Sequence, residues 1–310
     1  MLKIGILSGS KLAVPSIAFL LQNGIALEIV LPDRDNEDQA ELEHHLIQFG
    51  LPYQRWKKKQ VNQQLASWSL SAQLNYIWVL TFPYIINEET LKYLSVPIFN
   101  FHFAPLPKYR GAQPVFWMIK NLEKEGGIAI HELTKEIDAG PIHHFEPYII
   151  KAQETFGSYM QNISQLNIQA IDRFLPQLLQ SKEKHPIEIQ KEDSSNYFTK
   201  PDSFDVRINW ENMTAVQIEA LCRACNPWNR GAMTTLEGKL VRIIEVEIHK
   251  ELNQAKAKPG SIVLKKNVNR FFVSTSDSKY LELRVIATEE GIYGAERMMN
   301  ALPHSDALFQ

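Results

Sequence analysis

The feature that most constrains the fold of this chain is the alternation of short apolar strands with helices along its N-terminal third. Strands are predicted at residues 2–10, 26–32, 52–56, 75–83 and 98–103. Helices are predicted in the intervals, at residues 13–24, 36–50, 61–73 and 87–94. Strands and helices that alternate at this spacing are typical of a parallel sheet covered by helices on both faces. The sequence therefore predicts an α/β fold with a doubly wound, mostly parallel sheet.

Beyond this alternation the composition changes, and a second domain is predicted. The remaining elements of the first domain are a helix, two strands and a long helix, predicted at 113–124, 127–134, 142–150 and 155–179. A polar stretch without apolar periodicity follows and indicates a linker. The C-terminal part is predicted to hold one helix and four short strands, at 209–224, 239–248, 260–264, 270–276 and 280–286. We therefore predict a first domain at 1–181, a linker at 182–204 and a small β-barrel domain at 205–310.

The predicted sheet lacks the glycine-rich turns that hold nucleotide phosphates. Neither G-x-G-x-x-G nor G-x-x-x-x-G-K-[ST] occurs in the chain, which argues against a nicotinamide or nucleoside triphosphate cofactor. In open α/β sheets, sites form outside the carboxyl ends of the strands. Asn100 and His102 stand at such an end, in the stretch "FNFHFAPLPKYRG" that spans residues 99–111.

Asn100 and His102 are predicted to face the same side of their strand, because residues two apart on a strand do so. The three neighbouring phenylalanines would then pack on the other side. Alone, this pattern is more typical of a core histidine bonded to a buried asparagine. The stretch "EIDAGPI" adds Asp138 in a predicted turn. A histidine, an asparagine and an aspartate in one cleft are a recurrent set for acyl transfer, because they supply a proton carrier, an oxyanion donor and an orienting carboxylate.

These motifs resemble those of the folate-dependent formyltransferases. "NFHFAPLPKYRGAQP" is similar to that family's signature N-x-H-x-S-L-L-P-x-Y-R-G-x-x-P, and "IDAGPI" is similar to its second motif. The stretches "IQKEDSSNYFTKPDSFDVRINW" and "RACNPWNRGAMTTLEGKLVRI" resemble the C-terminal part of methionyl-tRNA formyltransferases and of nucleotide-sugar formyltransferases. The resemblance thus covers nearly the whole chain. It implies a Rossmann-like catalytic domain followed by a barrel-like domain of the OB type.

The same resemblance implies transfer of a formyl group from 10-formyltetrahydrofolate to a primary amine. The family's catalytic triad falls on Asn100, His102 and Asp138. Asn100 would stabilise the tetrahedral oxyanion, and His102 would share that charge and carry the amine proton. Asp138 would set the protonation and the orientation of His102.

The pterin-binding loop of the family falls on the end of the strand predicted at 75–83. Its backbone would bind the ring, and its residues here are Thr81, Phe82, Pro83, Tyr84 and Ile85. The sequence departs from the family pattern in two segments of the site. Phe82 and Pro83 replace the usual Tyr-Gly of this loop. After N-x-H-x, Ala104 replaces the serine, and Pro105-Leu106-Pro107 stands for Leu-Leu-Pro. The departures leave the catalytic triad intact but put the exact pterin contacts in question.

The resemblance leaves the amine acceptor open between an aminoacyl-tRNA and an amino-sugar nucleotide. Methionyl-tRNA formyltransferases carry a longer, basic loop after the second strand, although the size and domain plan of this chain suit that group. Here the same region is short and acidic, with Asp33, Asp35, Glu37, Asp38, Glu41 and Glu43. A tRNA surface needs lysine and arginine, because neutralised phosphates supply most of the affinity. The candidates in the second domain are Lys256, Lys258, Lys265, Lys266 and Arg270.

Two other functions fit the same residues. The chain could be a folate-binding or RNA-binding module without turnover, a reading that the complete triad disfavours. It could also be a hydrolase that releases formate from 10-formyltetrahydrofolate, although such hydrolases usually carry an N-terminal regulatory domain that is not seen in this sequence.

The remaining features predict a cytoplasmic protein without a metal. The formal net charge is -2, and no signal-peptide pattern and no apolar run of membrane-spanning length occur. The two cysteines, Cys222 and Cys225, are too few for a disulfide framework or a four-ligand zinc site and are interpreted as structural thiols. Arg110 is interpreted either as a residue that orients the cleft or as part of a structural ion pair.

Overall fold

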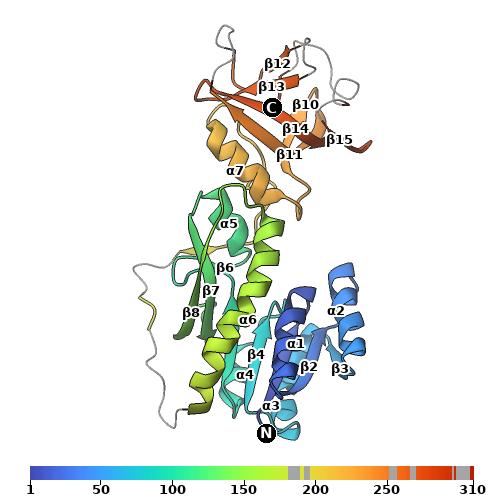
Figure 1. Cartoon of the computed structure of the whole chain (residues 1–310), viewed down its shortest axis with the longest axis vertical. Coiled ribbons are helices and arrows are strands. Elements are labelled where there is room, and N and C mark those ends of the chain that lie inside the picture. Colours follow the sequence, from blue (N-terminus) through green and yellow to red (C-terminus); the bar gives the residue numbers. More distant parts are fainter. Residues whose placement is uncertain (181–188, 192–195, 251–256, 266–269, 295–296, 298–307) are drawn as a thin grey trace. The chain divides into compact units, whose positions relative to one another are not determined.

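The chain folds into two compact units, described here from a computed structural model (Figure 1). The structure describes residues 1–180, 189–191, 196–250, 257–265, 270–294, 297 and 308–310. The first unit comprises residues 1–111, 125–149 and 160–198, and the second comprises residues 112–124, 150–159 and 199–310. The second unit thus includes two segments from within the predicted first domain, and the domain limits drawn from the sequence stay a prediction.

The first unit is built on a seven-stranded sheet with the order β3-β2-β1-β4-β5-β7-β8. Its strands are β1 (Lys3–Ser8), β2 (Ala26–Pro32), β3 (Tyr53–Trp56), β4 (Tyr76–Leu80), β5 (Ile98–His102), β7 (Glu125–Glu132) and β8 (Ile142–Ile149). The five strands from β3 to β5 pair in parallel, whereas β7 and β8 are antiparallel to their neighbours. The predicted mostly parallel α/β sheet is therefore confirmed.

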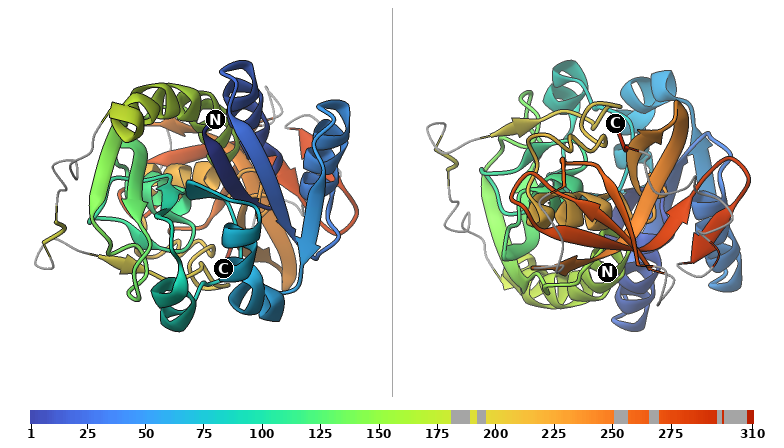
Figure 2. Two further views of the ribbon diagram at one scale, coloured as in Figure 1. Left: turned by 90° about the horizontal axis from the view of Figure 1, so that it is seen from below. Right: turned by 90° about the horizontal axis from the view of Figure 1, so that it is seen from above.

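Helices cover both faces of this sheet (Figure 2). They are η1 (Lys11–Ala13), α1 (Val14–Gln22), α2 (Glu37–Gln48), α3 (Lys58–Ser71), α4 (Glu88–Tyr93) and α6 (Phe156–Gln180). Two of them begin where an asparagine accepts a hydrogen bond from the first helical turn, Asn36 at α2 and Asn87 at α4. No helix in the described part of the chain is long and apolar enough to cross a membrane.

Each face of the sheet has its own apolar core, as the alternation of side chains along β4 requires. On one face, Trp78 contacts Phe101 of β5 and Phe174 of α6, with ring centroids 5.2 and 6.2 Å apart. On the other face, Val79 belongs to a buried cluster that includes Trp68 of α3. The strands are therefore sandwiched between α6 and α3.

The second unit contains an antiparallel sheet with the order β10-β11-β14-β13-β12, to which β15 adds beside β14. Its strands are β10 (Ala232–Leu236), β11 (Lys239–His249), β12 (Ile262–Lys265), β13 (Arg270–Ser274), β14 (Tyr280–Ala287) and β15 (Ile292–Gly294). Its helices are α5 (Pro114–Lys120) and α7 (Ala215–Cys225). The predicted small β-domain, a half-barrel, is confirmed. The helix predicted from residue 209 begins only at Ala215, because Thr214 and Gln217 form a capping box there.

The predicted linker is partly described, and two of its residues form a strand that its polar composition did not predict. Residues 182–188 and 192–195 lie outside the described residues. Tyr197–Phe198 (β9) pairs in parallel with Arg110–Gly111 (β6). Gly111 has a φ of +98°, and a Cβ atom there would overlap the carbonyl oxygen of Phe198. This pairing therefore requires glycine at that position.

We expect Phe174→Ala to destabilise the first unit, because Phe174 is fully buried and contacts aromatic rings of β4 and β5. Phenylalanine-to-alanine changes in a core cost about 3–5 kcal/mol. Urea unfolding followed by far-UV circular dichroism measures the loss. Leu179→Ala is the matched control on the same helix, since Leu179 is 60% exposed. Equal midpoints for the two variants would contradict the assignment of Phe174 to the core.

Candidate active site

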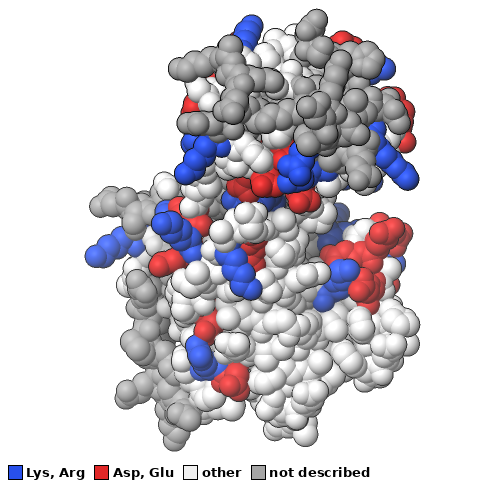
Figure 3. Space-filling view, turned by 45° about the horizontal axis from the view of Figure 1, so that its top comes forward, with Lys and Arg blue, Asp and Glu red and all other residues white. Residues whose placement is uncertain are grey.

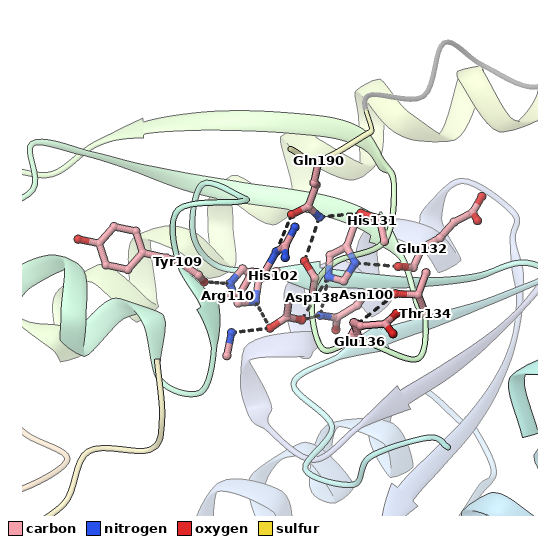
Figure 4. A network of polar contacts seen from close by, with 12 residues as sticks. Asn100, His102, Tyr109, Arg110, His131, Glu132, Thr134, Glu136, Asp138 and Gln190 are labelled. Carbon is pink, nitrogen blue, oxygen red and sulfur yellow. Dashed lines mark hydrogen bonds and ion pairs between the residues drawn. The ribbon is translucent and has the colours of Figure 1, made fainter. Parts of the chain in front are cut away.

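The carboxyl end of β5 carries the two polar side chains that the sequence singled out. The neighbouring Phe99 and Phe101 turn to the α6 face, where Phe99 packs edge-on against Phe174 at 5.2 Å. Asn100 and His102 turn to the other face and point toward Asp138 (Figure 4). The period of two thus separates apolar from polar side chains on this strand, as predicted.

Asp138 is the group on which the polar side chains converge (Figure 4). Its Oδ2 accepts a hydrogen bond from the backbone N–H of Gly111 at 2.9 Å and lies 3.6 Å from Nδ1 of His102. Its Oδ1 lies 3.4 Å from Nδ2 of Asn100 and 3.4 Å from Nε2 of His131. The structure therefore brings the three residues of the predicted triad together, with His131 as a fourth side chain.

Asp138 lies in the loop between β7 and β8, in a conformation that few residues adopt. Its φ is +53°, in the left-handed region where a non-glycine residue is strained. The loop is packed closely, because a Cβ atom on Gly140 would overlap the carbonyl oxygen of Glu132. The backbone therefore presents the carboxylate from a fixed and strained turn.

His131 is a residue of this site that the sequence analysis missed. It is buried, and the antiparallel register of β5 and β7 places it directly opposite Asn100. Its Nδ1 lies 2.9 Å from the carbonyl oxygen of Glu132, and its Nε2 lies 3.1 Å from Nδ2 of Asn100. A carbonyl only accepts, so Nδ1 carries the hydrogen and the lone pair of the neutral ring faces Asn100. Only the cross-strand register could have revealed this contact.

The tautomer of His102 follows from its second contact. Its Nε2 lies 2.6 Å from the carbonyl oxygen of Tyr109, so Nε2 donates a hydrogen bond there. In the neutral ring the lone pair is then on Nδ1, the atom that faces Oδ2 of Asp138. A proton added at Nδ1 would be stabilised by this carboxylate.

Burial and the neighbouring charges set the protonation states of this pair. Burial is the largest influence on Asp138 and would raise its pKa. The charge that His102 carries when protonated, the hydrogen bond and charge of a protonated His131, and the N–H of Gly111 outweigh burial and lower the pKa to about 2. Burial also lowers the pKa of His102 and His131 adds to this effect, while Asp138 opposes it. At neutral pH the site therefore holds an ionised aspartate beside a neutral histidine.

The loop predicted to bind the pterin ring lies at the switch point of the sheet. The chain leaves β1 toward β2 and β3 on one side and returns as β4 on the other. Thr81 follows β4 with a φ of +60°, and its carbonyl accepts a hydrogen bond from the N–H of Gly9, the residue after β1. Crevices at such switch points are the usual ligand sites of open α/β sheets.

This loop packs on the same side of the sheet as Asn100. Phe82 and Tyr84 pack against the cluster that contains Ile98, which is two residues from Asn100 on β5 and shares its face. Pro83 and Ile85 are exposed. The loop and the polar cluster are therefore found on one face of the parallel sheet.

Among the residues that the structure describes, one group of possible metal ligands occurs in the second unit, but it is neutralised by arginines. Glu247, His249 and Glu282 place ligand atoms within 4.8 Å of one another. Arg284 contacts both carboxylates, and Arg270 lies 3.4 Å from Glu282. The cationic partner of these carboxylates is thus supplied by the protein.

The two cysteines have the properties of structural thiols. Cys222 and Cys225 are both buried in α7. Burial is the main cause that raises the pKa of Cys222 well above its usual value and that of Cys225 to about 12. Both are therefore neutral at physiological pH, where a redox or metal-binding role would need thiolate.

Comparison with protein-family models matches both halves of the chain. The model described as formyl transferase matches residues 21–175, and the model described as formyl transferase, C-terminal domain, matches residues 202–302. These matches follow the order of the two predicted domains.

Curated relatives and solved structures agree with these matches. The chain is 26% identical over 259 residues to a methionyl-tRNA formyltransferase of Sorangium cellulosum, covering 82% of each protein. It is 33% identical over 220 residues to a bifunctional polymyxin resistance protein of Wigglesworthia glossinidia brevipalpis, covering 70% of this chain but only 32% of that protein. An N-formyltransferase of Helicobacter canadensis, solved with folinic acid and dTDP-3-aminofucose, has the same fold, with a TM-score of 0.69 at 19% identity over 94% of this chain and all of that one.

The contacts of His102 predict the direction in which its pKa responds to the loss of Asp138. We expect the pKa of His102 to lie below its usual value near 6.5, and Asp138→Asn to lower it further, because the carboxylate favours the charged ring. NMR titration of the imidazole signals measures both values. Asp277→Asn, which removes another carboxylate whose pKa is about 2, is the control and should leave His102 unchanged. A rise in the Asp138→Asn variant would refute the proposed coupling.

Proposed function

The chain belongs to the formyl transferase family, and from this premise we propose that it transfers a formyl group from 10-formyltetrahydrofolate to a primary amine. One observation carries the proposal: Asn100 and His102 lie together at the carboxyl end of β5, with the carboxylate of Asp138 3.4 Å from Nδ2 of Asn100 and 3.6 Å from Nδ1 of His102. The loop after β4 opens at the switch point of the same sheet. A proton acceptor, an amide donor and a loop that can bind the formyl donor are the parts that such a transfer needs.

His102 takes the proton of the attacking amine in this mechanism. Its Nε2–H is held by the carbonyl of Tyr109, so the proton arrives at Nδ1, 3.6 Å from Oδ2 of Asp138. The bond from the amine nitrogen to the formyl carbon forms, and the bond from that carbon to N10 of tetrahydrofolate breaks. The proton lost by the amine is passed to N10, so atoms and charge balance. The low pKa of Asp138 keeps the carboxylate ionised while the ring is charged.

Asn100 stabilises the negative charge that develops on the formyl oxygen. Its Nδ2 lies 3.1 Å from Nε2 of His131 and 3.4 Å from Oδ1 of Asp138, and these two acceptors are 3.4 Å apart. These three distances form a nearly equilateral triangle, so the two acceptors are about 60° apart as seen from Nδ2. The two N–H bonds of an amide diverge by about 120°. One N–H can serve both acceptors and the other can point to the oxyanion.

The backbone of residues 81–85 is the part of the chain best suited to bind the pterin ring. Among the described residues, the N–H groups of Phe82, Tyr84 and Ile85 have no hydrogen-bond acceptor within the protein. These N–H groups can therefore donate to a ligand, and the edge of a pterin offers both donors and acceptors. The Pro83 that replaces glycine of the family pattern removes one N–H donor from this loop.

The acceptor we place first is an aminoacyl-tRNA, as for methionyl-tRNA formyltransferases. Support comes from the relative of that name that matches four fifths of the chain. Of the basic residues suggested for a tRNA surface, Lys256 and Lys266 and the side chain of Lys265 lie outside the described residues. Lys258 is exposed, whereas Arg270 contacts Glu282.

An amino-sugar nucleotide is the alternative acceptor, and the charge pattern favours it. Lys11 pairs with Glu41, and Arg55 pairs with Asp35 and Glu43, so two cations near α2 are already engaged. On the face drawn in Figure 3, many of the lysine and arginine side chains among the described residues lie beside acidic ones. A sugar nucleotide has two phosphates and needs fewer cations than a tRNA acceptor stem.

We expect His102→Ala and Asp138→Ala to abolish formyl transfer, because each removes a group that handles the amine proton. Asn100→Ala should lower kcat by about 100- to 1000-fold while the affinity for folate is kept, since its contact forms mainly in the transition state. Steady-state kinetics and folate titration measure these effects. His44→Ala, an exposed histidine on α2, is the control. Near wild-type turnover in the His102 or Asp138 variant would overturn the assignment.

A side-by-side assay distinguishes the acceptors. Purified protein and 10-formyltetrahydrofolate are offered charged initiator tRNA, 4-amino-sugar nucleotides or no acceptor, and the formylated product and free formate are measured. Turnover of tRNA should fall steeply as salt rises, whereas turnover of a sugar nucleotide should change little. Formylation of tRNA but not of the sugar nucleotides would exclude an amino-sugar nucleotide as the acceptor. Formate released at the same rate without any acceptor would instead identify a hydrolase.

A further inference from the structure

One side chain of the predicted linker is inserted into the active site. Gln190 is 9% exposed, whereas the preceding Ile189 is 79% exposed. Its Nε2 donates to the carbonyl oxygens of Asp138 at 2.9 Å and Gly140 at 2.6 Å, and its Oε1 accepts from Nε of Arg110 at 3.0 Å (Figure 4). The side chain thus contacts both the aspartate loop and the segment after β5.

These contacts allow Gln190 only one orientation. Carbonyl oxygens can only accept and the Nε–H of arginine can only donate, so a flipped amide would place like groups against each other at all three contacts. The two N–H groups and the oxygen of the amide are all in use. No other uncharged side chain of the same length offers two donors and an acceptor in this arrangement.

The contacts of Gln190 also complete a closed ring around the Asp138 carboxylate. Gly111, which donates its N–H to Oδ2 of Asp138, follows Arg110 directly in the chain. Gln190 joins the side chain of Arg110 to the backbone of Asp138. The dipeptide Arg110–Gly111 therefore contacts Asp138 in two ways. Gly111 bonds the carboxylate directly, and Arg110 is connected to the backbone carbonyl through Gln190.

We propose that Gln190 is a positioning residue for formyl transfer, through which the segment after α6 holds the Asp138 carboxylate in place for His102. The proposal rests on the proposed function. It assigns a part in the active site to Gln190, a residue that the sequence analysis placed in a linker.

Loss of the Gln190 hydrogen bonds should slow the reaction, because the backbone of Asp138 is strained. A residue with φ at +53° stays there only while its surroundings hold it, and Gln190 bonds its carbonyl and that of Gly140. Without these bonds the loop relaxes and the carboxylate moves away from Nδ1 of His102. A displacement of about 1 Å in a catalytic site costs on the order of 100-fold in rate.

The test compares Gln190→Met with Gln63→Met. Methionine keeps the length of Gln190 and removes its three hydrogen bonds, and Gln63 is an exposed glutamine on α3 that serves as the matched control. We expect Gln190→Met to lower kcat by about 10- to 100-fold with the KM for 10-formyltetrahydrofolate unchanged. The pKa of His102, followed by NMR, should fall as its anionic neighbour moves away, with His131 the other titratable group that faces the ring. Gln63→Met should change neither value.

Two results would overturn the proposal. One is a wild-type kcat in Gln190→Met. The other is an unchanged pKa of His102 in this variant, even if the melting temperature falls, because a merely structural role would lower stability alone. If the methionine variant does not fold, Gln190→Glu keeps the Arg110 contact, lacks the two donors and should show the same loss of kcat. A wild-type protein that formylates no acceptor would refute the proposed function, and the NMR measurement would still decide the role of Gln190.

Discussion

The interaction on which the rest of this site depends is the burial of one carboxylate among polar groups from three separate segments. Asp138 receives contacts from β5, from β7 and from Gly111, and its loop is bonded by Gln190 of the linker. A buried carboxylate is costly unless its oxygens are satisfied. Here the partners outweigh the burial and keep the pKa near 2, so the charge itself holds the segments together.

The sheet provides the rigid frame that this arrangement needs. Strands β4 and β5 are held from one side by the aromatic contacts of Trp78, Phe99 and Phe174, and from the other by the cluster around Trp68. Side chains in such close-packed cores occupy defined rotamers. Strain at Thr81 and Asp138 can therefore be kept at the edge of the sheet, where a ligand would bind.

The different neighbours of His102 and Asp138 explain their different protonation states. His102 is buried beside a second histidine and beside a carbonyl that accepts its Nε2–H, which leaves Nδ1 free to take a proton. Asp138 accepts hydrogen bonds from the N–H of Gly111 and from Nδ2 of Asn100, and it stays ionised. The surroundings of His102 disfavour a positive charge and keep the ring neutral, whereas those of Asp138 favour a negative charge. At neutral pH the ring therefore has a lone pair that can accept a proton, next to a carboxylate that stabilises the charged ring.

The sequence by itself determined the mostly parallel sheet, the small β-domain and the shared face of Asn100 and His102, because strand periodicity is a local signal. Asp138 was added to this pair through the resemblance of its motif to a known family. Only the tertiary structure decided the rest of the site. His131 enters through the register of an antiparallel pair, and Gln190 through a contact across more than fifty residues. The linker has no apolar pattern to indicate a strand, yet Tyr197–Phe198 pairs with Arg110–Gly111. Such contacts depend on how distant segments meet in the fold, and no local pattern in the chain records them.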